Sequence, residues 1–195
     1  MSDIHEKLKQ ATVGIAGLGG LGSTVATALA RTGVGRLVIA DFDKVETSNL
    51  NRQHYFLDQI GREKVAALTE NLLRINPDLK ITGFQQKLTE ENIPRIFADA
   101  DVIAECFDKA DQKQMIVQTV LTKMERPVIV SASGLAGYGK SNEIQTRRIS
   151  KRLILVGDNK SGIDTGLPLT APRVWIAASH QANAIIEILI DEIIK

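Results

Sequence analysis

The chain has little of what several classes of protein require. It has 195 residues and a single cysteine, Cys106, so it can form neither an intrachain disulfide nor a cysteine-based zinc cluster. Its histidines, His5, His54 and His180, do not have the spacing of metal ligands. Aromatic residues make up only 4%, which argues against a surface that stacks nucleic-acid bases.

Strong charge and long apolar segments are missing as well. The net charge is +1, so no overall field attracts nucleic acid or an anionic membrane surface. The apolar runs are much shorter than a membrane span needs. The first ten residues are polar and charged, unlike a signal peptide. We therefore expect a cytoplasmic protein that binds neither nucleic acid nor a membrane.

What is present fits one globular domain over residues 1–195. Hydrophobic residues make up 44% and charged residues 24%, close to globular averages. Short apolar runs rich in β-branched residues alternate with segments of helical periodicity. The expected strands cover 12–16, 36–40, 79–84, 101–104 and 128–131, and the expected helices 3–10, 23–32, 62–75, 89–97 and 109–123. This alternation predicts an α/β, Rossmann-like, mostly parallel sheet with helices on both faces.

The last third of the chain has a different pattern. Residues 142–149 and 152–156 are two expected strands with no helix between them, which predicts an antiparallel C-terminal extension of the sheet. Residues 157–168 are expected to form a loop. Pro172 suits the first turn of a closing helix over about 173–194.

A glycine loop lies between the first expected strand and helix. Gly17, Gly19 and Gly22 match G-x-G-x-x-G, with Gly20 inside the motif, and Asp41 ends the second strand. Glycines let the backbone approach phosphate, and a carboxylate at the second strand end can bind ribose hydroxyls. A tight turn that binds nothing is the alternative. The motif does not discriminate among NAD, FAD and ATP.

The segments after the loop carry a more specific signal. G-x-G-G-L-G-S at 17–23, D-F-D-x-V-E-x-S-N-L-N-R-Q at 41–53 and G-R-E-K-V at 61–65 resemble the adenylating enzymes related to ubiquitin-activating enzymes. Within that superfamily the chain is most similar to the short variety of the bacterial thiamine-biosynthesis ThiF group. The resemblance runs from residue 8 to the final helix, and its N-L-N-R-Q block is much more specific than the glycine loop.

The resemblance implies a role for particular residues. Asp41 would hold the ribose, and Asp108, in Glu105-Cys106-Phe107-Asp108-Lys109, would hold Mg²⁺. The residues expected to act in catalysis are Arg52, Lys64 and Asp108. The residues expected to bind ATP are Gly17, Gly19, Gly20, Gly22, Asp41, Asp43, Asn49, Arg52, Gln53 and Lys64.

The reaction implied is adenylation. A carboxylate attacks the α-phosphorus of ATP and pyrophosphate leaves, so cations and a metal ion must neutralise charge without a protein nucleophile. The substrate would be the C-terminal glycine carboxylate of a small ubiquitin-like sulfur carrier ending in Gly-Gly, in thiamine biosynthesis. The family also implies a homodimer in which the arginine equivalent to Arg52 often reaches across the interface.

Each of these residues also has a simpler interpretation. Lys64 could be a solvated helix lysine, Arg52 an interface ion pair, Asp108 a helix cap and Asn49 a turn residue. Unlike many relatives, the chain has no C-x-x-C pair, so no zinc is expected. Cys106 is interpreted as a packed residue, and no later cysteine is available for the covalent carrier linkage of some relatives.

Two further features invite a functional interpretation. Residues 134–141 match the P-loop pattern G-x-x-x-x-G-K-S, but the segment that follows alternates like a strand, whereas a P-loop must open a helix. We expect a flexible glycine loop beside the nucleotide pocket that could contact the carrier tail. The basic residues at 147, 148, 151 and 152 are either a solvated sheet edge or a docking site for an acidic carrier.

Three other functions compete with adenylation of a carrier. An NAD(P)-dependent oxidoreductase could use the same glycine loop, but nothing resembles a hydride-transfer acid–base pair and the N-L-N-R-Q block would be unexplained. A non-catalytic adapter is disfavoured because Arg52, Lys64 and Asp108 are all present. Adenylation of a modified tRNA base is disfavoured by the lack of a basic surface signal.

Overall fold

One seven-stranded sheet forms the centre of the computed structural model, which describes residues 2–162 and 166–191. The strand order is β3-β2-β1-β4-β5-β7-β6, and all neighbouring pairs are parallel except β6–β7. The strands are β1 (Thr12–Ala16), β2 (Arg36–Asp41), β3 (Lys80–Gln85), β4 (Val102–Glu105), β5 (Val128–Ala132), β6 (Gln145–Ser150) and β7 (Leu153–Gly157). This confirms the predicted mostly parallel sheet with an antiparallel C-terminal extension.

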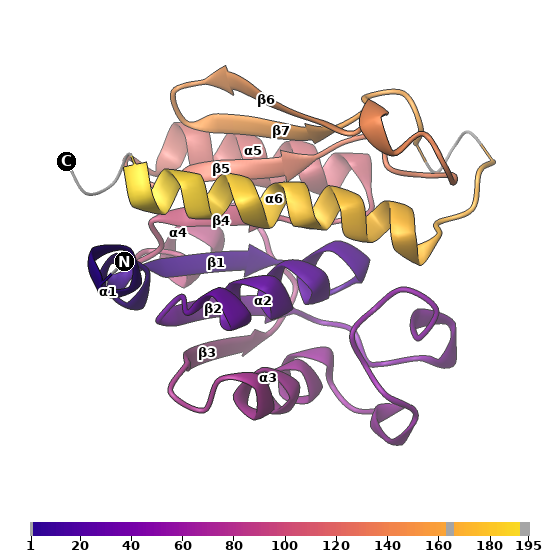
Figure 1. Ribbon diagram of the computed structural model, residues 1–195, viewed down its shortest axis with the longest axis horizontal. Helices are drawn as coiled ribbons and strands as arrows, with labels where there is room; N and C mark the ends of the chain where they lie inside the picture. Colours follow the sequence, from indigo (N-terminus) through magenta and orange to yellow (C-terminus); the bar gives the residue numbers. More distant parts are fainter. Residues whose placement is uncertain (1, 163–165, 192–195) are drawn as a thin grey trace.

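Helices cover both faces of this sheet. Figure 1 shows α2, α3 and α6 in front of the sheet and α4 and α5 behind it, with α1 at one end. The helices are α1 (Ser2–Gln10), α2 (Gly20–Thr32), α3 (Lys64–Ile75), α4 (Ile93–Ile96), α5 (Ala110–Lys123) and α6 (Ala171–Asp191). In the described part of the chain, no helix combines the length and apolar character needed to cross a membrane.

The core consists of two apolar clusters, one on each face. Side chains alternate along a strand, so Val102 and Ala104 of β4 pack in one cluster and Ile103 in the other. The first cluster contains residues of α2 and α6, such as Ile185, and the second contains residues of α5, such as Ile116. Strands buried on both faces explain why the sequence shows short continuous apolar runs rather than alternation.

Several boundaries differ from those predicted. The helix expected over 89–97 is only the short α4, because Pro94 fits only the first helical turn and regular structure therefore begins at Ile93. The strand expected from 142 begins at Gln145, after a one-turn 3-10 helix over Ser141–Glu143. The predicted end of the closing helix at 194 lies outside the described residues.

In the basic cluster near β6 and β7, Arg147 and Arg148 each donate to a nearby backbone carbonyl, and Arg152 makes a more extensive contact with a helix. The Arg152 guanidinium donates hydrogen bonds to the Val120, Leu121 and Met124 carbonyls at the C-terminus of α5. A helix leaves its last carbonyls without intrahelical partners, and a cation there is also favoured by the helix dipole. Arg152 therefore caps α5, while β6 is exposed along its whole length.

Replacing this cap should destabilise the fold without touching the site. We expect Arg152→Met to lower the free energy of unfolding by about 2 kcal/mol, because hydrogen bonds from a charged donor are lost. Urea denaturation measures the change, and Lys151→Met, at an exposed neighbouring position, is the matched control. Equal stability of the two variants would contradict the cap.

Candidate functional site

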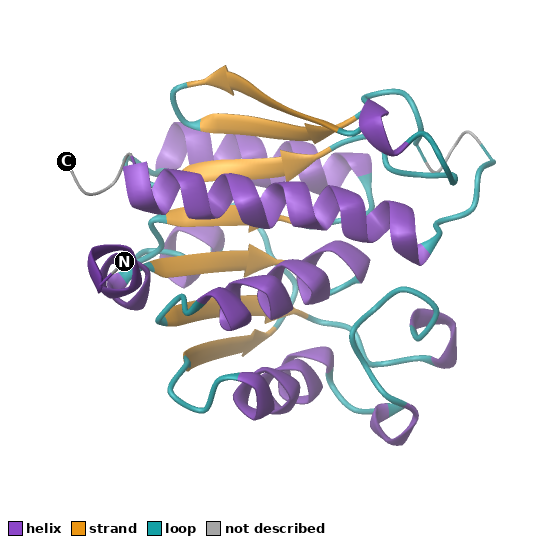
Figure 2. Ribbon diagram, viewed as in Figure 1, coloured by secondary structure: helices purple, strands orange, loops and turns teal. Residues whose placement is uncertain are grey.

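A cavity of about 930 Å³ opens at the carboxyl ends of the parallel strands. The loops that surround it gather at one edge of the sheet (Figure 2). They follow β1, β2, β3, β4, β5 and β7, and the cavity lies where the chain order reverses between β1 and β4. Open α/β sheets bind ligands at this switch point, and volumes of roughly 300–1,000 Å³ are typical of small-molecule sites.

The glycine loop forms one wall of the cavity. Gly17, Gly19 and Gly20 line it, and α2 starts at Gly20 with its free N–H groups at this end. Gly22 does not line the cavity. A Cβ at position 22 would lie 1.8 Å from the Gly17 carbonyl oxygen, so only glycine allows α2 to start this close to β1. Three glycines of the motif therefore face the cavity, and Gly22 permits the packing.

Asp41 connects this loop to the next one. Its buried carboxylate accepts a hydrogen bond from the Leu18 N–H at Oδ2 (2.6 Å) and from the Asp43 N–H at Oδ1 (2.7 Å). Asp41 also lines the cavity. Each carboxylate oxygen has two lone pairs, so both can accept a further hydrogen bond from a ligand hydroxyl.

Lys64 lies beside the cavity rather than in its wall. Its Nζ is 3.0 Å from Asp43 Oδ2, and only 6% of the side chain is exposed, so it is not a solvated helix lysine. Asp43 lines the cavity and Lys64 does not. Asn49 is also outside the lining, because its Oδ1 accepts the Glu46 N–H (3.0 Å) in a one-turn 3-10 helix. In this structure Asn49 is thus placed as a turn residue.

Arg52 and Gln53 both line the cavity. The Arg52 Nη1 donates to the Ser48 carbonyl (3.1 Å) and to Asn51 Oδ1 (2.8 Å), which holds the guanidinium in place. Gln53 is 8% exposed, and its Oε1 is buried without a hydrogen-bond partner among the described residues. A buried polar atom without a partner is costly, so this amide marks a position where a ligand can supply one.

Tyr55 fixes this segment and was not predicted from the sequence. Its hydroxyl donates to the Leu18 carbonyl (2.8 Å), which joins the loop after β2 to the glycine loop. Burial, and then the negative charges of Asp41 and Asp43, raise the pKa of Tyr55 above its ordinary value. The hydroxyl therefore remains a neutral donor. No local pattern in the sequence indicates this contact, since the two residues lie far apart in the chain.

Asp108 lines the cavity from the opposite side and is exposed. It does not cap α5, whose N-cap residue is Lys109 without a side-chain cap hydrogen bond. Glu105, which sequence reasoning did not single out, is fully buried nearby. Its Oε1 accepts the Phe107 N–H (2.7 Å) and Lys113 Nζ (3.1 Å). Glu105 thus fixes the segment that leads to Asp108.

Cys106 has the character of a packed residue. It is buried, and burial, followed by the negative charge of Glu105, raises the pKa of the Cys106 thiol, with Lys113 acting in the opposite direction. The thiol is therefore protonated at neutral pH and is a poor nucleophile.

The lining of the cavity carries charged side chains of both signs in equal number. Four cationic side chains line it together with acidic ones, namely Arg52, Lys87, Lys109 and Lys113 with Asp41, Asp43, Asp108 and Asp111. Over residues 2–162 and 166–191, no group of three or more His, Cys, Asp or Glu side chains could hold a metal ion. Mg²⁺ is usually held by one or two carboxylates plus phosphates and water, so Asp108 fits it only together with a phosphorylated ligand.

The P-loop-like segment forms another wall of the cavity. Gly134, Leu135 and Ala136 line it, but the segment leads into the 3-10 helix and strand described above, as expected for a loop that is not a P-loop. The Lys140 side chain is 72% exposed, and its Nζ lies 3.7 Å from a Glu143 carboxylate oxygen. The segment lies beside the cavity, as expected, and Arg173 of α6 donates hydrogen bonds to three of its carbonyls.

Arg173 also pairs with Asp158, and we expect this ion pair to make the free energy of unfolding depend on pH. Burial raises the pKa of Asp158, but hydrogen bonds from Ser161, Lys160 and Arg173 outweigh it and lower the pKa to about 2 from 3.8. A carboxyl whose pKa is lower in the folded than in the unfolded protein stabilises the fold at pH values above its unfolded-state pKa. This stabilisation is lost as the pH falls through the folded-state pKa.

The difference in unfolding free energy between wild type and Asp158→Asn should therefore be constant near neutral pH and shrink between about pH 4 and about pH 2. Urea unfolding across this range measures it. A difference that does not change with pH would show that the Asp158 charge contributes nothing to folding.

Comparison with known proteins agrees with these features. The sequence matches the ThiF family over residues 2–192. It is 40% identical over 136 residues to the sulfur carrier protein ThiS adenylyltransferase of Escherichia coli (strain K12), covering 69% of this chain and 54% of that protein. It is 35% identical over 148 residues to the tRNA threonylcarbamoyladenosine dehydratase of Bacillus subtilis (strain 168), covering 75% and 58%. The chain thus spans just over half the length of these relatives.

Solved structures show the same fold. The E. coli tRNA N6-threonylcarbamoyladenosine dehydratase, in complex with AMP, superposes with a TM-score of 0.85 at 20% identity, covering 98% of this chain and 91% of that one. The E. coli protein MccB with ATP gives a TM-score of 0.74 at 22% identity, covering 96% and 59%. At this level of identity the likeness shows the fold alone. The sequence match over residues 2–192 shows more: this chain belongs to the ThiF family.

Proposed function

We propose that residues 1–195 form one ATP-binding adenylation domain that activates the C-terminal glycine carboxylate of a small ubiquitin-like sulfur carrier. One observation carries the proposal: the glycine loop, Arg52, the orphaned amide of Gln53 and Asp108 all line one cavity in a chain of the ThiF family. The E. coli relative is named for adenylation of a sulfur carrier protein, which supports the same substrate class here. The role in thiamine biosynthesis is proposed from the resemblance to the thiamine-biosynthesis ThiF group.

The cavity suggests how the chain's own groups would act. The N–H groups at the start of α2 and the Arg52 guanidinium would bind the phosphates. The Asp41 carboxylate would accept hydrogen bonds from the ribose hydroxyls. The Gln53 amide can present either its oxygen or its nitrogen to the nucleotide. Asp108 would hold Mg²⁺, which neutralises phosphate charge when bound. Lys64 would act through Asp43, its ion-pair partner at the cavity wall.

The reaction requires no protein nucleophile. An oxygen of the carrier's terminal carboxylate attacks the α-phosphorus, a carboxyl–phosphate bond forms, and the bond between the α-phosphorus and the bridging oxygen breaks, releasing pyrophosphate. The products are the acyl-adenylate and pyrophosphate. Negative charge builds on the phosphoryl oxygens, and the positioned cations of the site stabilise it.

We also propose a homodimer and a carrier tail ending in Gly-Gly.

A modified tRNA base is the second candidate substrate. The B. subtilis relative is named for a reaction on threonylcarbamoyladenosine in tRNA, and its identity to this chain is only slightly lower. The near-zero net charge favours the protein substrate, because tRNA binding relies on contacts to many phosphates. An oxidoreductase and a non-catalytic adapter have no comparable support.

A direct assay separates these functions. The protein is incubated with Mg-ATP and a carrier ending in Gly-Gly, and mass spectrometry detects AMP on the carrier. We expect the wild type to form the adduct, and Arg52→Met and Asp108→Asn each to reduce its rate roughly 100-fold, because each removes stabilisation of transition-state charge. The matched control is Lys140→Met in the P-loop-like segment, which should retain wild-type activity since its side chain points into solvent.

The outcomes are distinct. Absence of carrier adduct and of carrier-dependent pyrophosphate exchange would refute the proposal, and AMP transfer to tRNA instead would support the second candidate. Binding of NADH without binding of ATP would support the oxidoreductase. Loss of ATP binding in Lys140→Met would mean that the second glycine segment, not the first, holds the phosphates.

A further inference from the structure

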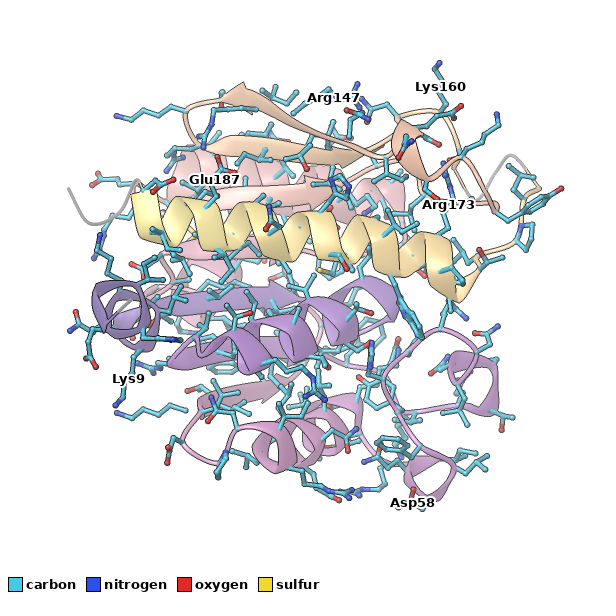
Figure 3. The ribbon with its side chains drawn as sticks, in the orientation of Figure 1. Lys9, Asp58, Arg147, Lys160, Arg173 and Glu187 are labelled. Carbon is cyan, nitrogen blue, oxygen red and sulfur yellow. The ribbon has the colours of Figure 1, made fainter. Side chains whose placement is uncertain are left out.

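Three consecutive residues at the start of α6 contact three different walls of the cavity. They are Arg173, Val174 and Trp175. Figure 3 shows Arg173 near the start of α6, at the edge of the molecule where Lys160 and the loops around the cavity lie. None of the three belongs to a motif of the sequence, and the proposed chemistry does not use them directly.

Arg173 holds the wall formed by the P-loop-like segment. Its side chain is 3% exposed and uses the whole guanidinium fork. Nε donates to the Ala136 carbonyl (3.2 Å), and Nη1 donates to the Gly139 and Lys140 carbonyls (2.8 Å each). Nη2 lies 2.7 Å from Asp158 Oδ2. One planar cation thus joins two loops that are far apart in the sequence.

Asp158 extends this contact to the cavity itself. Its Oδ1 accepts the Ser161 N–H (2.9 Å), and the Ser161 carbonyl accepts the N–H groups of Leu135 and Ala136 (3.0 Å each). A Cβ at Gly134 would lie 2.1 Å from Asp158 Oδ1, so the two loops are in close contact. Ser161, Gly134, Leu135 and Ala136 all line the cavity. The ion pair therefore fixes one whole wall.

The next two residues reach the other walls. A Cβ at Gly20 would lie 2.9 Å from Val174 Cγ1, so Val174 packs against the start of α2. Trp175 Nε1 donates to the Arg52 carbonyl (3.1 Å), and its ring lies 5.5 Å from the His54 ring. The first turn of α6 thus touches the glycine loop and the loop that carries the phosphate-binding residues.

We propose that Arg173 is a positioning residue. Through the first turn of α6, it sets the distance between two parts of the cavity: the wall formed by residues 133–136 and 161–162, and the proposed nucleotide-binding loops after β1 and β2. The inference rests on the proposed function, because that spacing would determine how the attacking carboxylate meets the α-phosphorus. Misplacement of reacting groups by about 1 Å can reduce the rate about 100-fold. Lysine cannot replace arginine here, since an ammonium is a point charge that cannot donate to four separated acceptors in one plane.

The test compares Arg173→Lys with wild type and with Arg95→Lys, a conservative change at an exposed position of α4 away from the cavity. Hydrogen exchange should accelerate at the amides of Leu135 and Ala136 and stay unchanged in β1 and α2. The turnover number for adenylation should fall at least about tenfold, while the Kd for ATP changes less than about threefold, because only the relative placement of the substrates changes. Arg95→Lys should match wild type in all three.

Asp158→Asn provides a second variant if Arg173→Lys does not fold. It keeps the acceptor oxygen for the Ser161 N–H but removes the ion pair, and we expect the same localised exchange pattern with a smaller loss of turnover. In either variant, unchanged exchange and turnover would overturn the inference. Exchange that accelerates equally in β1 and α2 would also overturn it, because it would show a general loss of stability instead.

Failure of the proposed function is distinguishable from failure of this inference. If the wild type forms no carrier adenylate, the proposed function fails, whereas the exchange pattern of the variants still shows whether Arg173 holds the wall. If the wild type forms the adenylate and the variants match it in both exchange and turnover, only the inference fails.

The Kd for ATP can be measured by fluorescence. Trp175, the single tryptophan of the chain, lies beside Arg52 and provides the signal for the titrations.

Discussion

The Asp41 carboxylate is the interaction on which the site depends. It accepts the backbone N–H groups of Leu18 and Asp43, and so joins the glycine loop after β1 to the long loop after β2. Asp43 in turn pairs with Lys64 at the start of α3. Tyr55 belongs to the same network, because its hydroxyl donates to the Leu18 carbonyl. The positions of the glycine loop and of the loop after β2 are therefore set by one buried carboxylate and its neighbours.

Buried charge surrounds the cavity on the other sides as well. Among the residues that the structure describes, three ion pairs near it have at least one buried member: Lys64–Asp43, Lys113–Glu105 and Arg173–Asp158. Taking charges out of water is costly, and such pairs contribute little net stability compared with apolar packing. Their directional hydrogen bonds fix the loops around the cavity. We interpret them mainly as groups that specify the geometry of the site, although removing one partner, as in Asp158→Asn, should still destabilise the fold because it leaves the other charge unpaired.

The fold could be predicted from the sequence because its signals are local. Buried parallel strands, helical periodicity and the glycine loop each occupy a few consecutive residues, and the structure confirms the sheet and its extension. Glu105 and Arg173 could not be predicted, because their partners, such as Ser131 and Ala136, lie 26 and 37 residues away. Asn49 and Lys64 lie outside the cavity lining. Asn49 is bonded to Glu46 within its own turn, and Lys64, at the start of α3, pairs with Asp43, which lies 21 residues earlier in the chain.

We propose that the first glycine loop, not the P-loop-like segment, receives the phosphates. A crystal structure of the protein with Mg²⁺ and a non-hydrolysable ATP analogue tests this most directly. We expect the triphosphate to lie against the start of α2, within hydrogen-bond distance of the Arg52 guanidinium, with the ribose at Asp41. A nucleotide whose phosphates lie along residues 134–141, or outside the cavity between β1 and β4, would contradict the claim.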